Sequence, residues 1–460
     1  AFDKRPPDIG SWPSNPVGPI HQSAKNKPFA NQSRSRSVSL VLFEATSLSL
    51  LAKLSSNEIT RQPMLLIAAC VGVICSSIVL PFYTMGLFVV PVTEEFGWSR
   101  TEFQLSLLFS TGFGVFTSPI IGLLIHRYGA RPVALFGLAG LSLAFIIPAT
   151  STGALWQFYS AYACMALLGA GTIPVTWTTA VTANFQTHRG LALGLVLSGT
   201  GLCAVIVPPI IAFILANYGW RAGYLGLAVL PVFVAGPLVY CCFKPQDKPQ
   251  DRTKEVEQTL NEPGYTLSEA VASYKFWVLL FSIFLVYIAQ SGLIPNLVPA
   301  LTDAGIDPVA AAETMSLFGV AVITGRLVIG FCVDRFWAPG VAAVAISLPI
   351  MGCLMLWSEL TLLNAQVAAL LLGFAAGAEL DLMAFLAAKY FGAKHYAKIY
   401  GFLYAALASA SGIAPALFAS IYESTQSYEL GFALGAVAFS LSVLLVLLLG
   451  RYPVLPGSRD

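Results

Sequence analysis

The chain has 460 residues, of which 57% are hydrophobic and only 10% are charged. A soluble domain usually carries about 25% charged residues, so this composition argues against an ordinary soluble enzyme or binding domain. The formal net charge is +2 and no basic stripe is present, which argues against a nucleic-acid partner. Apolar stretches of roughly 20 residues recur along the chain, the length at which a helix spans a lipid bilayer.

Residues 1–63 differ in composition from the rest of the chain. They are rich in Ser, Pro, Asn and basic residues, and they include the run Ser33–Ser37, in which Ser and Arg alternate. This composition is typical of disorder, and we expect a disordered N-terminal tail. A transit peptide and an extended reading frame are the alternative interpretations.

From residue 64 onward the sequence predicts twelve membrane-spanning helices. The first six are expected over 64–90, 103–125, 132–150, 155–183, 190–216 and 222–243, and the second six over 276–301, 309–333, 338–357, 362–388, 396–421 and 429–450. The expected fold is an all-α membrane protein with two six-helix halves, 64–243 and 276–451. The mixed-charge stretch 244–275 is expected to form a central loop, and 452–460 a short C-terminal tail.

The loops on the two sides of the predicted bundle differ in positive charge. On the side of both termini they hold Arg127, Arg131, Arg189, Lys244, Lys248, Arg252, Lys254, Lys275, Arg335, Lys389, Lys394 and Lys398, whereas the opposite loops hold Arg100 and Arg221. Positively charged loops stay on the cytoplasmic side, so both termini are predicted to be cytoplasmic. We expect a multi-pass protein of the plasma or inner membrane.

Cysteine usage indicates neither a disulfide framework nor a metal site. The eight cysteines lie in or at the edge of apolar segments, without a Cys-x-x-Cys pair or a neighbouring His. They are interpreted as small buried hydrophobic residues. No nucleophile–base pair, phosphate loop or metal cluster is recognisable, so the sequence predicts no enzyme activity, no cofactor and no bound metal.

One short motif occurs twice, 208 positions apart, each time after a long apolar segment. The first copy comprises Gly122, His126, Arg127, Gly129 and Arg131, and the second comprises Gly330, Asp334 and Arg335. Such a repeat between membrane helices indicates a chain built from two similar halves. Parallel halves with a cavity between them are the architecture of a secondary transporter.

The pattern Gly-x-x-x-Asp-Arg-x-Gly-x-Arg resembles the signature of the major facilitator superfamily, and the resemblance covers residues 64–451. It implies twelve helices, alternating access and a conformational-gating role for the motif. His126 departs from the pattern, because the family has Asp there, capping a helix of the opposite half. A neutral imidazole suits a positive helix N-terminus less well than a carboxylate. We therefore expect a weakened cytoplasmic lock.

Three further stretches narrow the resemblance within the superfamily. They are Phe96–Arg100, Asn184–Gly194 with the Ser198–Gly199 pair that follows, and Tyr218–Arg221. Together they are similar to the branch of monocarboxylate porters and oxalate–formate antiporters. The resemblance implies an organic anion as substrate, since members of this branch carry varied organic anions.

Arg326 is predicted at membrane depth, where a charge must be paired or hydrated, so it is a functional candidate. Its guanidinium is a planar fork that matches a carboxylate at two points. Its position resembles that of the arginine that binds the substrate carboxylate in the monocarboxylate branch. The alternative is a structural ion pair with Asp334 or Glu379.

Glu379 and Asp381 are also predicted at membrane depth. They are two residues apart, about 200° around a helix, so they cannot both face a central cavity. We favour Glu379 for the cavity and for proton uptake. Asp381 shares a face with Gly373 and Gly377, which suggests a tight helix seam and a structural hydrogen bond or ion pair. The assignment would reverse if this helix is kinked.

The remaining polar residues of the spans suggest a site for a monoanion. The first span has no lysine where the monocarboxylate branch carries one, and Lys398 in the eleventh lies at its cytoplasmic edge. Arg326 is then the one deep cation, which suits a monoanion better than a dianion. Candidates for lining the cavity are Tyr83, Tyr287, Gln290, Asn296 and Tyr404; simple packing of the tyrosines is the alternative.

These observations predict a monomeric secondary transporter that moves a small organic anion, a monocarboxylate, by proton symport or anion exchange. Arg326 would bind the carboxylate and Glu379 would carry the proton. The expected partners are the organic anion, a proton or counter-anion, and the lipid bilayer. An exporter of drugs or amphipathic compounds on the same scaffold is the first alternative. A transporter-like sensor is the second.

Overall fold

The computed structural model describes residues 62–185, 189–243, 264–392, 394–454 and 456, which belong to one compact unit. Within these ranges the chain is almost entirely helical and contains no β-strand, only an isolated bridge between Gly264 and Gly392. The tail expected at 1–63 and most of the expected central loop lie outside the described residues.

Short and long helices alternate in the first half. They are α3 (Pro63–Ile74), α4 (Val79–Phe96), α5 (Arg100–Gln104), α6 (Ser106–Tyr128), α7 (Ala130–Ala149), α8 (Leu155–Leu168), η1 (Gly169–Thr172), α9 (Pro174–Asn184), α10 (Arg189–Leu197), α11 (Gly199–Val229), η2 (Leu230–Ala235) and α12 (Gly236–Cys242).

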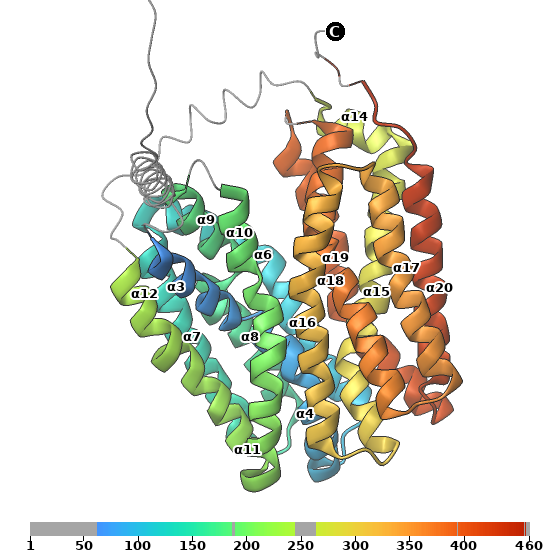
Figure 1. Cartoon of the computed structure of the whole chain (residues 1–460). Helices are drawn as coiled ribbons and strands as arrows, with labels where there is room; N and C mark the ends of the chain where they lie inside the picture. The colour runs from blue at the N-terminus through green and yellow to red at the C-terminus, as the bar shows by residue number, and fades with distance from the viewer. Residues whose placement is uncertain (1–61, 186–188, 244–263, 393, 455, 457–460) are drawn as a thin grey trace, which may run out of the picture. The chain divides into compact units, whose positions relative to one another are not determined.

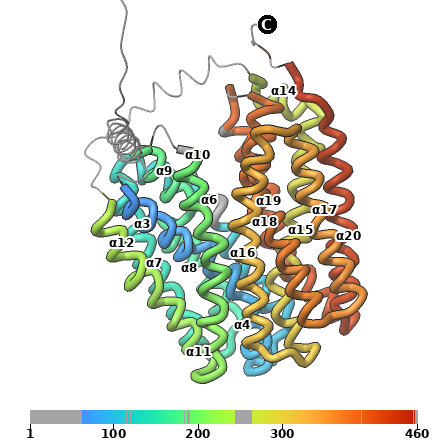
Figure 2. Tube along the Cα trace, viewed as in Figure 1, coloured from blue at the N-terminus to red at the C-terminus, as the bar shows by residue number. Residues whose placement is uncertain are grey.

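The second half is more regular, because each of its spans is one continuous helix. After the short α14 (Leu267–Ala272) come α15 (Tyr274–Asp303), α16 (Pro308–Val333), α17 (Ala338–Ser358), α18 (Leu362–Phe391), α19 (Tyr396–Thr425) and α20 (Glu429–Leu448). In Figures 1 and 2 these six long helices stand together as one bundle beside the helices of the first half.

Ten continuous helical stretches of the described chain are long and apolar enough to cross a membrane, and α5 with α6 adds a bent one. The longest, Gly190–Cys242, has 53 residues, more than twice the length that a bilayer requires. Gly219 interrupts it with φ +80°, a conformation that favours glycine, so the stretch is a hairpin of two spans. The predicted twelve-helix fold with two six-helix halves is confirmed.

The first and fourth spans are broken near one another. The first extends to Phe96, beyond the predicted end at residue 90, and is interrupted between α3 and α4. The backbone N–H of Ser77, in this break, donates to the Thr172 hydroxyl (2.9 Å), which lies in the break of the fourth span. The side chain of Thr172 therefore replaces a bond that a continuous helix would have made.

The two halves approach closely where α11 meets α16, side by side in Figures 1 and 2. A Cβ atom added to Gly201 of α11 would lie 2.7 Å from the Gly319 carbonyl oxygen of α16. Glycine is required here because only the absence of a side chain allows this approach, as in other membrane-helix contacts. This glycine contact therefore joins the two halves.

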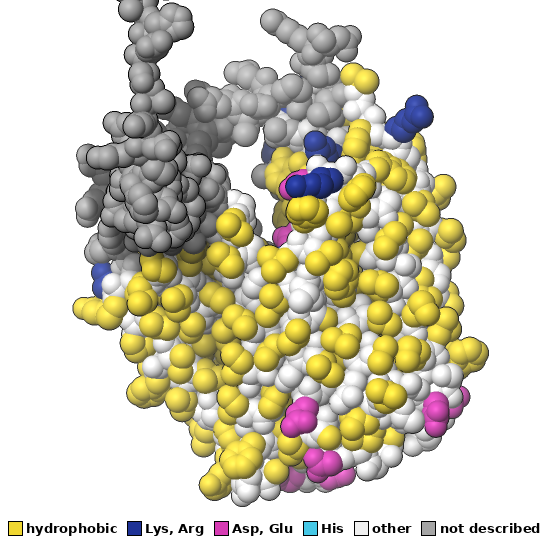
Figure 3. Space-filling model, viewed as in Figure 1, with side chains coloured by type: hydrophobic (Ala, Val, Ile, Leu, Met, Phe, Trp, Pro, Cys, Tyr) yellow, Lys and Arg dark blue, Asp and Glu magenta, His cyan; other side chains and the backbone are white. Residues whose placement is uncertain are grey.

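We call the side of the bundle where α6 and α16 end the motif side, because the repeated motif lies there, and the opposite side the gate side. Figure 3 shows hydrophobic side chains covering the flank between the two. Acidic side chains gather at the gate side in this view, and basic ones lie toward the motif side. An apolar belt between polar ends is the surface of a multi-pass integral membrane protein.

Candidate transport site and gates

An ion pair joins the two halves on the gate side. The Arg100 guanidinium in α5 lies 2.5 Å from the Asp303 carboxylate at the end of α15, and it also donates to the Tyr428 hydroxyl. Arg100 is the first residue of a helix that Ser99 and Glu102 cap reciprocally, and this capping box fixes where the arginine lies.

Two further contacts beside this pair also cross between the halves. The Thr101 hydroxyl and backbone N–H both donate to Glu423 of α19. Deeper in the membrane, the buried amides of Gln104 and Asn296 donate to each other at 2.8 and 3.2 Å. Asn296, a candidate for lining the cavity, therefore belongs to the gate-side closure.

The sequence did not identify Asp303, Glu423 or Gln104 as functional residues. Arg100 stood out because it lies in the Phe96–Arg100 stretch, but its partner lies 203 positions away. No local signal marks a pair at that separation.

On the motif side, the repeated motif makes its described contacts within each half. Arg131 donates to the Tyr240 carbonyl oxygen at 2.6 Å, and Arg335 lies over the Phe331 ring. The side chains of His126 and Asp334 are exposed and have neither a hydrogen bond nor an ion pair within the described part of the chain. Figure 3 shows a notch between the halves on this side, so the structure is closed at the gate side and parted at the motif side.

Arg326 is positioned by a seam of glycines between α16 and α18. Added Cβ atoms on Gly325, Gly373 and Gly377 would each collide with a backbone carbonyl oxygen of the opposite helix. The resulting close approach brings the Arg326 Nε to 3.0 Å from the Gly377 carbonyl oxygen and 3.2 Å from the Asp381 Oδ2.

The Arg326–Asp381 pair is asymmetric in its exposure. Only 5% of the arginine side chain is exposed, against 45% of the aspartate side chain. The buried Nη1 of Arg326 has no hydrogen-bond partner within the described residues. A buried guanidinium nitrogen without an acceptor is costly, so this edge of the fork suits an anionic ligand.

Glu379 lies in the interior of the second half, 9% exposed, and its Oε1 has no partner among the described residues. It lines a small pocket between α15, α17, α18 and α20. The sequence placed the two carboxyls on different faces of this helix, and the structure does so too. The more exposed of the two, however, is Asp381, although the sequence favoured Glu379 for the cavity.

The aromatic candidates gather around these charges. Tyr83 of α4, in the first half, packs against Phe318 of α16 with ring centroids 5.9 Å apart. It lies within electrostatic range of both Arg326 and Glu379. Tyr287 is similarly close to Glu379, Tyr83 and Tyr404.

Gln290 of α15 lies against α18. Its side chain donates to the Leu372 carbonyl oxygen at 3.2 Å, and it is 3% exposed. Of the five expected lining residues, Tyr83 and Tyr287 thus lie within electrostatic range of the central charges, and Tyr404 lies within range of Tyr287.

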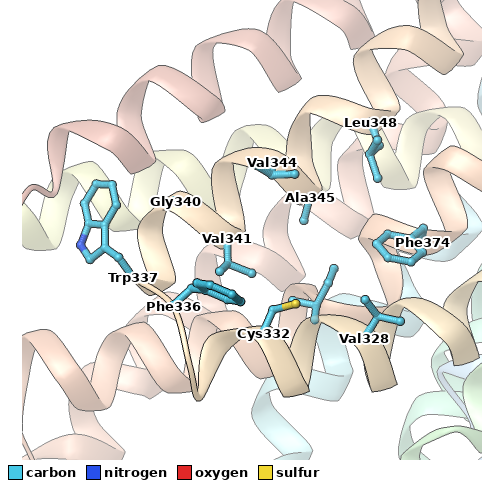
Figure 4. Close-up of a pocket in the computed structure, with 11 residues that line it drawn as sticks. Val328, Cys332, Phe336, Trp337, Gly340, Val341, Val344, Ala345, Leu348 and Phe374 are labelled. Atoms are coloured by element: carbon cyan, nitrogen blue, oxygen red, sulfur yellow. The ribbon is translucent and has the colours of Figure 1, made fainter.

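A further cavity, about 550 Å³, lies elsewhere, between α16 and α17. Figure 4 shows its lining side chains, among them Val328, Val344, Phe336 and Phe374, and none is charged. Val344 and Phe336 are more than half exposed. This apolar groove faces outward, toward lipid, and does not suit a charged substrate.

A family model, the Major Facilitator Superfamily, matches residues 65–415 and 279–460, most of the chain. The chain belongs to the Major Facilitator Superfamily. The protein is therefore a transporter rather than an enzyme, and its twelve helices are the superfamily's architecture.

Curated relatives are similar at low identity. Monocarboxylate transporter 13 of Bos taurus is 27% identical over 302 residues, 62% of this chain and 65% of that protein. Monocarboxylate transporter 11 of Homo sapiens is 26% identical over 263 residues, 56% and 53% of the two chains. The MFS-type transporter YcxA of Bacillus subtilis (strain 168) is 25% identical over 251 residues, 54% and 59%. The chain thus covers less than two thirds of the length of each of these three relatives.

Proposed function

We propose that this superfamily member carries a small organic anion, a monocarboxylate, by alternating access, with proton symport or anion exchange. The observation that carries the proposal is the buried Nη1 of Arg326, which lacks an acceptor in the described chain while Nε is held by α18. The names of the monocarboxylate transporters among its relatives support the same substrate class.

Arg326 and Tyr83 explain how binding could be linked to movement of the halves. A substrate carboxylate would accept hydrogen bonds from the open edge of Arg326, in the second half. Tyr83, in the first half, lies within electrostatic range of this arginine and would contact the same substrate. A ligand held by both halves favours the states in which both contacts are made.

The carboxyls supply the counter-charge and the proton. In the empty site Asp381 neutralises Arg326. A bound carboxylate adds a second negative charge beside the same guanidinium, and a proton on Glu379 keeps a third negative charge out of the site. An unpaired carboxylate at membrane depth is costly, so the protonated form suits the unpartnered Glu379.

The proposed orientation places the motif side, with both termini, in the cytoplasm of a cell whose plasma or inner membrane holds the protein as a monomer. The excess of Lys and Arg in the motif-side loops supports this orientation. The structure, closed at the gate side, is then the inward-facing state.

Uptake into proteoliposomes tests the proposal. Labelled lactate, pyruvate, formate, oxalate, a neutral sugar and a cationic dye are offered with and without an inward proton gradient, to the wild type, Arg326→Ala and Glu379→Gln. Gradient-driven monocarboxylate uptake that both variants lose is expected. Uptake only against preloaded anion would leave exchange and remove the proton role of Glu379. Transport of dye or sugar alone, unaffected by Arg326→Ala, would overturn the anion proposal in favour of an exporter.

A further inference from the structure

We propose that Glu379 exchanges its proton with motif-side water through a channel inside the second half, separate from the cavity between the halves. The inference rests on the proton symport proposed above. It assigns the substrate a route to Arg326, beside Asp381. The proton has a separate route to Glu379, on the other face of α18.

The channel begins from a cavity of about 40 Å³ lined by α15, α17, α18 and α20, all of the second half. Each buried water needs about 10–15 Å³ of such volume, so a few water molecules fit. Glu379 lines this cavity, and its Oε1 has no partner in the described structure. An unpartnered carboxyl oxygen beside space for water is a natural proton acceptor.

The lining residues extend from Glu379 toward the motif side. Glu379 lies twelve residues before the motif-side end of α18, about 18 Å away, whereas Leu386, also in the lining, lies five residues from that end, about 8 Å. Ala342 lies four residues after the start of α17, about 6 Å from its motif-side end. The cavity therefore covers most of the depth that separates Glu379 from motif-side water.

Hydroxyl groups accompany this path. Tyr287 and Ser282 of α15 line the cavity together with Glu379. The Ser282 hydroxyl shares a 2.7 Å hydrogen bond with the Ser442 hydroxyl of α20. Such groups both donate and accept, so they can pass a proton along a chain of waters.

The charged surroundings of Glu379 separate the two routes. Tyr287 of α15 lines the same cavity, Tyr83 of α4 lies within electrostatic range of Glu379, and Tyr404 of α19 lies within range of Tyr287. The lining residues from α17 and α20 are Ala342, Ala345, Ile346 and Val446, none of which titrates. The exposed carboxyl near Arg326 is Asp381. A substrate at Arg326 would thus meet Asp381, while the proton reaches Glu379 from the opposite side of α18.

The direct test measures hydrogen–deuterium exchange of the protonated Glu379 carboxyl in the purified full-length protein. Its infrared C=O band is identified as the one that Glu379→Gln removes. Ala342→Leu adds bulk to the cavity lining near its motif-side end, and Val344→Leu adds bulk two residues away at a position 66% exposed. We expect Ala342→Leu to slow deuterium exchange of this band at least tenfold and Val344→Leu to leave it unchanged.

Ser282→Ala is the second variant, because it removes a hydroxyl without adding volume, and it decides the test if Ala342→Leu does not fold. It is expected to slow the exchange as well. Unchanged exchange in both variants, or no protonated band for Glu379, would overturn the channel.

A transport measurement separates this inference from the function on which it rests. Ala342→Leu should retain exchange of labelled lactate but lose accumulation driven by a proton gradient. Absence of lactate transport by the wild type would overturn the proposed function, while the infrared measurement would still decide whether the channel exists. Gradient-driven accumulation at wild-type level in Ala342→Leu would contradict the separate route.

Discussion

Arg326 is held along one edge by α18, with its Nε 3.0 Å from the Gly377 carbonyl oxygen and 3.2 Å from Asp381 Oδ2. The Nη1 on the other edge is buried without a partner in the described chain. The helix that fixes the arginine in place therefore leaves half of the guanidinium fork free. In the proposed site, this open edge is the one that would bind the substrate carboxylate.

Arg326→Lys should lower kcat/KM for monocarboxylate uptake by about 10- to 100-fold, because a lysine keeps the charge but not the fork and forfeits a charged hydrogen bond of about 1.5–3 kcal/mol. Initial uptake rates in proteoliposomes measure the change. The exposed Arg451, outside the spans and the repeated motif, offers a matched control, since Arg451→Lys should leave uptake kinetics near wild type. Wild-type kinetics in Arg326→Lys would argue against carboxylate binding by the fork.

Asp381→Asn should lower KM for the anion by about fivefold, because it removes the negative charge that competes with the substrate for Arg326. The estimate corresponds to about 1 kcal/mol, the upper value for a partly exposed pair. We expect kcat to fall as well, because Asp381 would no longer displace the substrate from Arg326 during release. A raised KM would mean that Asp381 orients the arginine rather than competing with its ligand.

The Arg100–Asp303 pair is expected to hold the gate side closed. Arg100→Ala should raise the ratio of gate-open to gate-closed molecules about fivefold, for a contribution of about 1 kcal/mol. Spin labels at Asn217 and Glu359, exposed gate-side residues of the two halves, report the distance distribution. The exchanged pair, Arg100→Asp with Asp303→Arg, should restore the closed population.

If Arg100→Ala does not change that distance distribution, the pair does not control the gate. A residual closed population is still expected in Arg100→Ala, because Gln104 and Asn296 hold the halves together below the ion pair.

Gly377→Ala should destabilise the protein by about 1–3 kcal/mol, because the added Cβ would lie 2.9 Å from the Arg326 backbone nitrogen and even closer to the Val322 carbonyl oxygen. Thermal unfolding of the purified protein measures the loss. Gly401→Ala is the matched control, since nothing lies within 4 Å of a Cβ at that helical glycine. Equal stability of the two variants would contradict the tight α16–α18 seam.

The capping box of α14 should make this helix sensitive to acid. The Thr266 backbone N–H donates to the Glu269 carboxylate at 2.7 Å, and this bond, with the Thr266 side chain, lowers the pKa of Glu269. Because the pKa is lower in the folded state, the carboxylate stabilises the helix at pH values above the pKa of the unfolded state. This contribution disappears as the pH falls through the pKa of the folded state. Amide exchange in α14, corrected for intrinsic rates, should therefore accelerate below the ordinary Glu range.

Glu269→Gln is the control for this prediction, because an amide cannot be protonated in that range. Its α14 exchange should show no such acceleration. Equal pH dependence in both proteins would mean that the box does not stabilise α14.

The sequence predicts the fold well because its signals are local. Apolar runs of sufficient length define most spans, and the repeated Gly-x-x-x-Asp-Arg type of motif indicates two related halves. Boundaries are less predictable: the first span extends to Phe96 and breaks near Ser77, where the Thr172 hydroxyl, 95 positions away, takes over a backbone bond. Such compensation depends on tertiary contacts that a hydropathy pattern does not contain.

The central site is predictable only in part. The rarity of charge at membrane depth identifies Arg326, Glu379 and Asp381, and helix geometry separates the two carboxyls. Which carboxyl meets the arginine depends on how α18 is rotated against α16. That rotation is set by the glycine seam, so sequence reasoning on one helix could not rank the pairs.

The most direct test of the account measures labelled lactate uptake and internal pH in the same proteoliposomes. A proton gradient should drive lactate inward with one proton entering per lactate, and both fluxes should vanish in Arg326→Ala. Lactate should also protect the purified wild type, but not Arg326→Ala, against thermal unfolding. Wild-type lactate uptake by Arg326→Ala, or transport confined to the sugar or dye, would contradict the account.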